Sequence, residues 1–103
     1  MANVKRRKPT TPGEILQEEY LTPLGLTQKE LALHIHYDVK VINRLINGRA
    51  SVTAPVAIKL AAALNTSPEF WLNAQKAVDI YEASKSIGKL PKALIINGHL
   101  APV

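Results

Sequence analysis

The sequence contains no cysteine, and its aromatic residues are one tryptophan, three tyrosines and one phenylalanine among 103 residues. The lack of cysteine excludes disulfides, thiolate metal sites and a cysteine nucleophile, and it agrees with a reducing compartment. Because aromatics are few, leucine, isoleucine, valine and alanine have to supply most of the core of a chain that is 47% hydrophobic.

Long apolar runs and catalytic motifs are lacking as well. No stretch approaches the roughly 18 apolar residues of a membrane span, and no apolar segment of the kind a signal peptide needs follows the charged N-terminus. We also find no glycine-rich phosphate loop, no paired carboxylates and no Ser/His/Asp arrangement. We therefore expect a cytoplasmic protein that is not an enzyme, with no cofactor, no small-molecule substrate and no membrane partner.

Positive charge is in excess, with a formal net charge of +5 and a sequence pI near 9.7. Such a balance hints at a polyanionic partner such as nucleic acid. Four of the cations form the run Lys5 to Lys8, inside a segment, residues 1–10, that has no apolar periodicity. We interpret residues 1–10 as a flexible basic arm, which either enters a minor groove or remains a solvated tail.

Capping signals divide residues 11–86 into five helices in one domain. Thr11 with Glu14, and Thr27 with Glu30, have the spacing of capping boxes. The first expected helix starts after Thr11 and ends near Thr22 and Pro23, and the second covers roughly residues 27–35. The third covers residues 39–47, between the Asp38 cap and Gly48. The last two cover the stretch from Thr53 to Asn65 and the stretch from Ser67 to Lys85. Glycine and proline interrupt residues 87–103, a C-terminal tail in which "ALIIN" is a short strand or a sticky end. The predicted fold class is all-α with two flexible tails.

The helix expected at residues 39–47 carries a polar stripe. At about 100° per residue, Lys40, Asn43, Arg44 and Asn47 fall on one arc of roughly 100°. The stripe has two cations, two amides and no carboxylate, so it suits the edges of bases and phosphates in a DNA groove, although plain solvent exposure is an alternative. Two short helices joined by a tight turn match a helix-turn-helix, in which Gln28 of the first helix can reach a phosphate.

A family resemblance rests on these same residues. The stretch "LTQKELALHIHYDVKVINRLINGRASVT" resembles the helix-turn-helix of the Xre and Cro-type repressors. More specifically, "PGEIL", "NGR" and "SPEFWLN" in combination resemble the HigA antitoxins, also known as VapI-type virulence-associated proteins, over roughly residues 11–85. The resemblance implies a five-helix bundle of lambda-repressor-like helix-turn-helix type.

The resemblance also implies partners and site residues. The partners are a second copy of the chain, operator DNA upstream of its own genes, and a HigB-type toxin that is a messenger RNA endonuclease. The base-facing residues are Val39, Lys40 and Arg44, and the phosphate contacts are Thr27, Gln28, Asn43, Asn47 and Arg49. Val39 departs from the amide common at its position and could touch a thymine methyl group instead. The dimer contacts on the last helix are Trp71, Val78 and Tyr81.

Several alternatives remain open at this stage. The protein could be an orphan or phage-type repressor without a toxin, or a protein-binding inhibitor whose DNA binding is vestigial. The basic arm or the apolar tail could each hold a toxin. We interpret Phe70 and Trp71 as core residues or dimer contacts rather than as platforms on which nucleic-acid bases stack. Tyr81 likewise belongs either to the core or to a dimer contact.

The pentapeptide "HIHYD", residues 34–38, has a His-x-His spacing that zinc sites often use. We expect no metal here, because no third or fourth ligand is near in the sequence and there is no cysteine. His36 stands in the turn where the family usually has a glycine with positive φ, a conformation that histidine tolerates better than most residues. His34 and His36 could approach phosphates, and operator binding would then strengthen at mildly acid pH.

Overall fold

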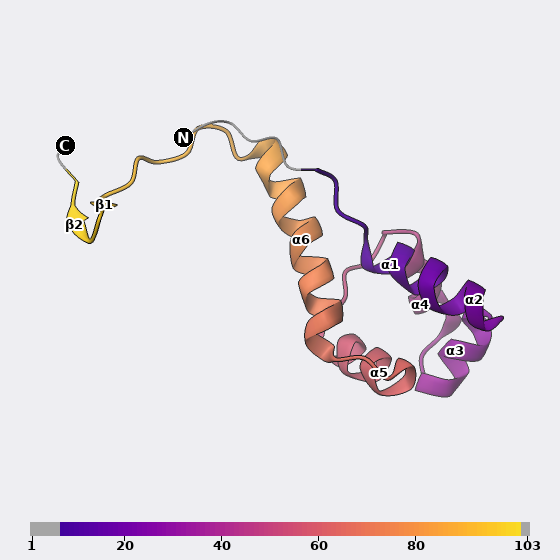
Figure 1. The fold of residues 1–103 in the computed structure, drawn as a ribbon. Coiled ribbons are helices and arrows are strands. Elements are labelled where there is room, and N and C mark those ends of the chain that lie inside the picture. The colour runs from indigo at the N-terminus through magenta and orange to yellow at the C-terminus, as the bar shows by residue number, and fades with distance from the viewer. Residues whose placement is uncertain (1–6, 102–103) are drawn as a thin grey trace.

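The computed structural model describes residues 7–101 and shows five helical segments followed by a short hairpin (Figure 1). The first segment is continuous and consists of α1 (Pro12–Ile15), the π-helical turn η1 (Leu16–Leu21) and α2 (Thr22–Leu24). The others are α3 (Gln28–Ile35), α4 (Val39–Ile46), α5 (Ala54–Leu64) and α6 (Pro68–Ser86). The predicted fold class, a five-helix all-α domain of helix-turn-helix type, is confirmed.

The first helical segment continues past Pro23, whereas the sequence predicts its end near Thr22 and Pro23. The difference comes from the π turn, in which the N–H of Thr22 donates to the carbonyl of Gln17, five residues earlier. The Gln17 amide also donates to the Thr22 hydroxyl at 2.9 Å. Proline cannot donate to a regular helical ladder and clashes with its carbonyls, so the widened turn accommodates Pro23. The segment ends at Gly25, which has a φ of 64°.

A single apolar core joins all five segments. Trp71 is completely buried within its own chain, where its indole N–H donates to the Thr66 hydroxyl at 2.7 Å. The rings of Tyr20 and Phe70 lie 5.7 and 5.1 Å from the Trp71 ring. Because no part of the Trp71 side chain is left exposed, its predicted role as a dimer contact is wrong, and the core role is the one it has. The largest fully buried side chains are Trp71, Leu16, Leu21, Leu31, Ile42 and Leu60.

Glycine at position 13 lets α1 approach the end of α4 very closely. A Cβ atom added to Gly13 would lie 2.2 Å from the carbonyl oxygen of Leu45 and 2.7 Å from the Cα of Ile46. Those are backbone atoms, which cannot rotate away as the end of a side chain can. Gly13 is therefore required for the distance between α1 and α4.

The C-terminal residues form a hairpin beyond α6. Strand β1 (Ile95–Ile96) pairs antiparallel with β2 (His99–Leu100), with Ile95 opposite Leu100. Asn97 and Gly98 between them have φ values of 51° and 78°, as a type I′ turn requires. Of the two possibilities for "ALIIN", the short strand is correct, and the following Asn-Gly pair was a hairpin signal that the sequence analysis missed. Figure 1 shows the hairpin far from α3 and α4, past the free end of α6.

Candidate DNA-binding surface

Reciprocal hydrogen bonds fix the start of α3. The Thr27 hydroxyl accepts from the backbone N–H of Glu30 at 3.0 Å, and the Glu30 carboxylate accepts from the N–H of Thr27 at 2.9 Å. These hydrogen bonds, first of all the one from the Thr27 backbone, lower the pKa of Glu30. Thr11 and Glu14 form a second capping box of the same kind at α1, and its hydrogen bonds, first of all the one from the Thr11 backbone, lower the pKa of Glu14. Both capping boxes were predicted from spacing and are confirmed.

The turn between α3 and α4 depends on a left-handed residue. His36 has a φ of 62° and a ψ of 42°, so it occupies the conformation that the sequence analysis assigns to this position. The next residue, Tyr37, donates its N–H to the carbonyl of Ala32 at 2.9 Å, which closes the end of α3. Asp38 then caps α4, because its carboxylate accepts from the N–H of Lys40 at 2.8 Å.

Lys59 of α5 contacts both the last residue of α3 and the turn that follows it. Its Nζ donates to the carbonyl of Ile35 at 3.3 Å and lies 4.5 Å from the centre of the Tyr37 ring. A cation is favourable both at a helix C-terminus and over an aromatic face. The role of Lys59 cannot be predicted from the sequence, since nothing local to it signals a contact with residues more than twenty positions earlier.

One face of α4 is buried and the opposite face is open. Ile42 and Leu45 are in the core, whereas Lys40, Asn43, Arg44 and Asn47 are exposed. Val39 is 40% exposed and lies beside this stripe rather than in the core. Together with Gln28 of α3, four of these residues line a shallow surface groove: Val39, Lys40, Asn43 and Arg44. The structure thus brings all three predicted base-reading residues to one surface.

A chain of three side-chain amides connects the start of α3, α4 and the C-cap residue of α4. The Asn47 side-chain amide donates to the Asn43 side-chain oxygen, and the Asn43 amide donates to the Gln28 side-chain oxygen, both at 3.2 Å. Gln28 accepts in this chain, so its own two N–H groups stay available for a phosphate oxygen. All three residues were predicted as phosphate contacts, and the fold joins their side chains in one hydrogen-bonded row.

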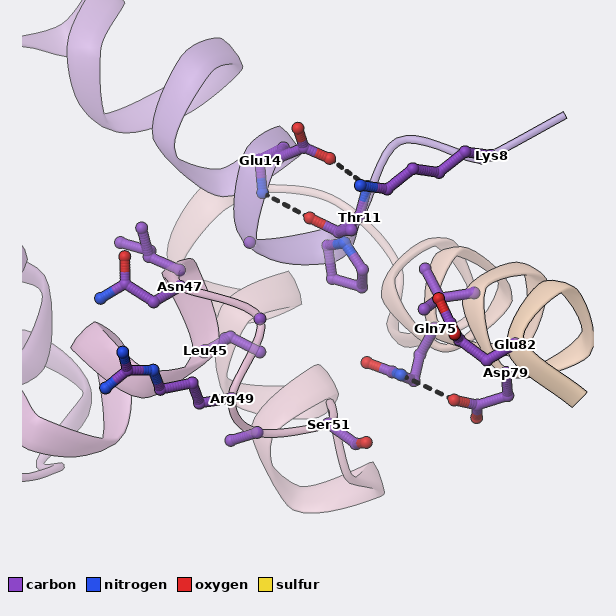
Figure 2. A pocket seen from close by; sticks show the side chains of 16 residues that line it. Lys8, Thr11, Glu14, Leu45, Asn47, Arg49, Ser51, Gln75, Asp79 and Glu82 are labelled. Atoms are coloured by element: carbon purple, nitrogen blue, oxygen red, sulfur yellow. Dashed lines mark hydrogen bonds between the residues drawn. The ribbon is translucent and has the colours of Figure 1, made fainter. Parts of the chain in front are cut away.

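The remaining cation of the predicted set, Arg49, follows α4. Its backbone N–H donates to the carbonyl of Arg44 at 2.8 Å, which caps α4, and its side chain is exposed. Arg49 and Asn47 line one side of a groove of about 600 Å³, and α6 contributes Asp79 and Glu82 on the other (Figure 2). Arg49 and the two acids of α6 therefore lie on opposite sides of one groove.

Gln75 ties α6 to the segment that follows α4. Its side-chain oxygen accepts from the backbone N–H of Val52 at 2.9 Å, and its amide donates to Asp79 at 2.9 Å, the latter drawn in Figure 2. This hydrogen bond fixes the long helix to the loop between α4 and α5. Val78 and Tyr81, the other predicted dimer contacts, are half-buried on the same helix. Their place in a dimer stays a prediction.

Three other predictions concern histidines, metals and the arm. His34 and His36 are both exposed at the end of α3, and their approach to phosphate stays a prediction. Within residues 7–101, no three side chains of His, Asp or Glu lie together in a way that could hold a metal ion. None of the helices described in this range is both long and apolar enough to cross a membrane. Lys5 and Arg6 of the basic arm lie outside the described residues, and Arg7 and Lys8 are exposed.

The fold and this surface define a helix-turn-helix DNA-binding protein, and comparison with known proteins agrees. The helix-turn-helix family model matches residues 17–71. Antitoxin HigA-1 of Vibrio cholerae is 51% identical over 77 residues, which are 75% of this chain and 72% of that protein. Virulence-associated protein I of Dichelobacter nodosus is 38% identical over 72% of this chain and 68% of its own length.

A solved structure extends the likeness to a protein–DNA complex. Antitoxin GraA in complex with its operator has a TM-score of 0.78 and 33% identity, over 90% of this chain and 98% of that one. The chain therefore belongs to the Xre-type helix-turn-helix family, in the group that contains the HigA antitoxins and virulence-associated protein I. Its relatives are regulators and antitoxins and not enzymes.

Proposed function

We propose that this protein is a dimeric antitoxin that binds an operator upstream of its own genes, represses them, and neutralises a HigB-type messenger RNA endonuclease. The observation that carries the DNA-binding part is the exposed stripe on α4, which combines Lys40 and Arg44 with an amide row and has no carboxylate. The similarity to GraA, whose structure contains its operator, supports the same role.

In this proposal α4 enters the major groove and α3 lies across the backbone. Arg44 and Lys40 donate to base edges, and Val39 makes an apolar contact with a thymine methyl group. Gln28, Asn43 and Asn47 hold the phosphate next to α3, helped by the hydroxyl group of Thr27, whose own N–H is used in the capping box, and by Arg49. Two copies, with half-sites about 34 Å apart, would read a two-fold symmetric operator.

Substitution of Arg44 tests the reading surface. Arg44→Ala should weaken binding to the cognate operator and cost about 1 to 3 kcal/mol of discrimination at one base pair, because a bidentate base contact is lost. Competition gel shifts with single-base operator variants would measure this discrimination. Lys76→Ala, which removes an exposed cation of α6, is the matched control and should leave it unchanged. Equal discrimination by Arg44→Ala and the unsubstituted protein would remove Arg44 from the reading set.

The toxin and the dimer need separate tests. Co-expression with the product of the adjacent gene should yield a stable complex, whereas an orphan repressor would purify alone with the same operator affinity. A protein-binding inhibitor with vestigial DNA binding would give the opposite result, a complex without operator affinity. For the dimer, Val78→Asp and Tyr81→Asp should shift the sedimenting species from dimer to monomer, because each would bury a charge at the contact.

A further inference from the structure

Gln28 has a side chain with two opposite ends, and only one of them suits a phosphate. The oxygen of a glutamine amide accepts hydrogen bonds, whereas its nitrogen carries two N–H donors. A phosphate oxygen is itself an acceptor, so it is attracted by the N–H end and repelled by the oxygen end. Because Gln28 begins α3 and lines the groove beside Lys40 and Arg44, the orientation of its amide decides whether it favours or opposes DNA binding.

Asn43 determines that orientation from α4. Its side-chain N–H donates to the Gln28 oxygen at 3.2 Å, although the two residues are fifteen positions apart in the sequence. The bond occupies the acceptor end of Gln28 and leaves both of its N–H donors for another partner. The reverse orientation of Gln28 would place two donors against each other, and no hydrogen bond would form.

Asn47 gives Asn43 its own orientation. Both asparagines are exposed, so hydrogen bonding rather than packing fixes their amides. The Asn47 amide donates to the Asn43 oxygen at 3.2 Å, one helical turn further along, which leaves the Asn43 nitrogen to face Gln28. Hydrogen bonds that run in one direction polarise one another, so the N–H groups at the Gln28 end become stronger donors. The row of amides therefore ends in a donor, as an anion requires.

The other side chains of the groove do not hold the Gln28 amide. Val39 has no polar side-chain atom, and no hydrogen bond joins Lys40 or Arg44 to Gln28 in the part of the chain that the structure describes. The two cations are the groups expected to donate to base edges. The orientation of Gln28 thus depends on Asn43.

We propose that Asn43 is a positioning residue of the DNA-binding surface, which holds the Gln28 amide so that its N–H donors meet a phosphate oxygen. This inference rests on the proposed function and gives the three amides different tasks in it: Gln28 makes the contact, and Asn43 and Asn47 act through Gln28. A phosphate contact carries no sequence information, so the contribution of Asn43 is the same for every base sequence.

A double-mutant cycle tests whether Asn43 acts through Gln28. Gel shifts with the full chain and the DNA immediately upstream of its gene give the operator affinity of each variant. Gln28→Ala should lower this affinity by about tenfold or more, because a hydrogen bond to a charged group is lost. Asn43→Leu should lower it by nearly as much by itself, but by less than about twofold when residue 28 is already alanine. Leucine favours helices more than asparagine does, so α4 stays formed.

Two further measurements separate positioning from a general displacement of α4. Asn43→Leu should lower the affinity for all single-base operator variants by the same factor, whereas a displaced α4 would change the discrimination that Lys40 and Arg44 provide. The dependence of affinity on salt concentration should keep its slope, because no cation is removed. Asn73→Leu is the matched control: it makes the same exchange at an exposed asparagine of α6 and should leave operator affinity unchanged.

The possible outcomes are distinguishable. Failure of the unsubstituted protein to bind the upstream DNA would remove the DNA-binding part of the proposed function together with this inference. Effects of Gln28→Ala and Asn43→Leu that multiply in the double variant would overturn this inference alone, because Asn43 would then make a contact of its own. A loss of base discrimination in Asn43→Leu would also overturn it, and would assign Asn43 to base reading or to the shape of α4.

Discussion

Replacing Gly13 by alanine should both destabilise the domain and weaken operator binding. The new Cβ would lie 2.2 Å from the Leu45 carbonyl oxygen, whereas ordinary van der Waals contacts of a Cβ begin at 3.4 Å. The backbones of α1 and α4 would thus have to separate by roughly 1 Å, because both sides of the contact are main chain. Overpacking of this kind costs about 1 to 3 kcal/mol.

Two effects oppose each other in this variant. Alanine is favoured over glycine within a helix by about 0.5 to 1 kcal/mol, since glycine loses more backbone entropy on folding. The clash is with main-chain atoms, so the steric cost should lie near the upper end of its range, which leaves a net destabilisation of about 2 kcal/mol. For a domain of this size, each kcal/mol lowers the melting temperature by about 4 to 8 °C. Thermal unfolding followed by circular dichroism measures the shift.

Operator affinity gives the second readout for Gly13→Ala. Leu45 and Ile46 belong to the last turn of α4, so in the proposed complex their displacement would change how Arg44 and Asn47 meet the DNA. Affinity should be measured well below the melting temperature, where the variant is fully folded, so that a loss reports position and not unfolding. An unchanged or raised melting temperature would refute the steric argument. A lowered melting temperature with unchanged operator affinity would refute the link between α1 and the proposed reading helix, α4.

Gly25→Ala is the matched control for this pair of measurements. Gly25 has a φ of 64° and nothing within 4 Å of an added Cβ, so alanine there meets backbone strain and no clash. Left-handed backbone costs an alanine about 1 to 2 kcal/mol, so stability should fall by a similar amount. Operator affinity should remain that of the original protein, because the end of α2 does not contact α4 as α1 does.

Two further predictions concern the turn and the cap of the DNA-binding unit. His36→Gly should stabilise the protein by up to about 1 kcal/mol in urea unfolding, because glycine accepts a φ of 62° without strain; a loss of stability would show that the imidazole makes compensating contacts. The hydrogen bonds from Thr27 lower the pKa of Glu30 below its ordinary value of 4.5. Glu30 therefore stabilises the folded state fully above pH 4.5, and this contribution is lost as the pH falls through the lowered pKa. The Glu30→Gln variant should therefore lose less stability on acidification than the unsubstituted protein does. Glu18 lies outside any capping box, so Glu18→Gln is the control and should lose as much stability as the unsubstituted protein.

Local signals predicted the helical framework well. The capping boxes at Thr11 and Thr27, the Asp38 cap and Gly48 after α4 act over three or four residues, so their effect can be read from spacing alone. The same is true of the α4 stripe, because an amphipathic helix turns its apolar face inward wherever it packs. The first helical segment runs one residue beyond Pro23, because the turn before it widens, and local spacing does not record that widening.

The sequence by itself determined that this chain is a helix-turn-helix domain in which the helix after the turn is basic and free of carboxylates, since helix ends and faces follow from interactions between near neighbours. Only the tertiary structure decided that Trp71 belongs to the core, that Lys59 clamps the turn, and that Gly13 sets the distance from α1 to α4. Those outcomes depend on packing between residues that are tens of positions apart, and no periodicity within one segment records which distant backbone will lie against it.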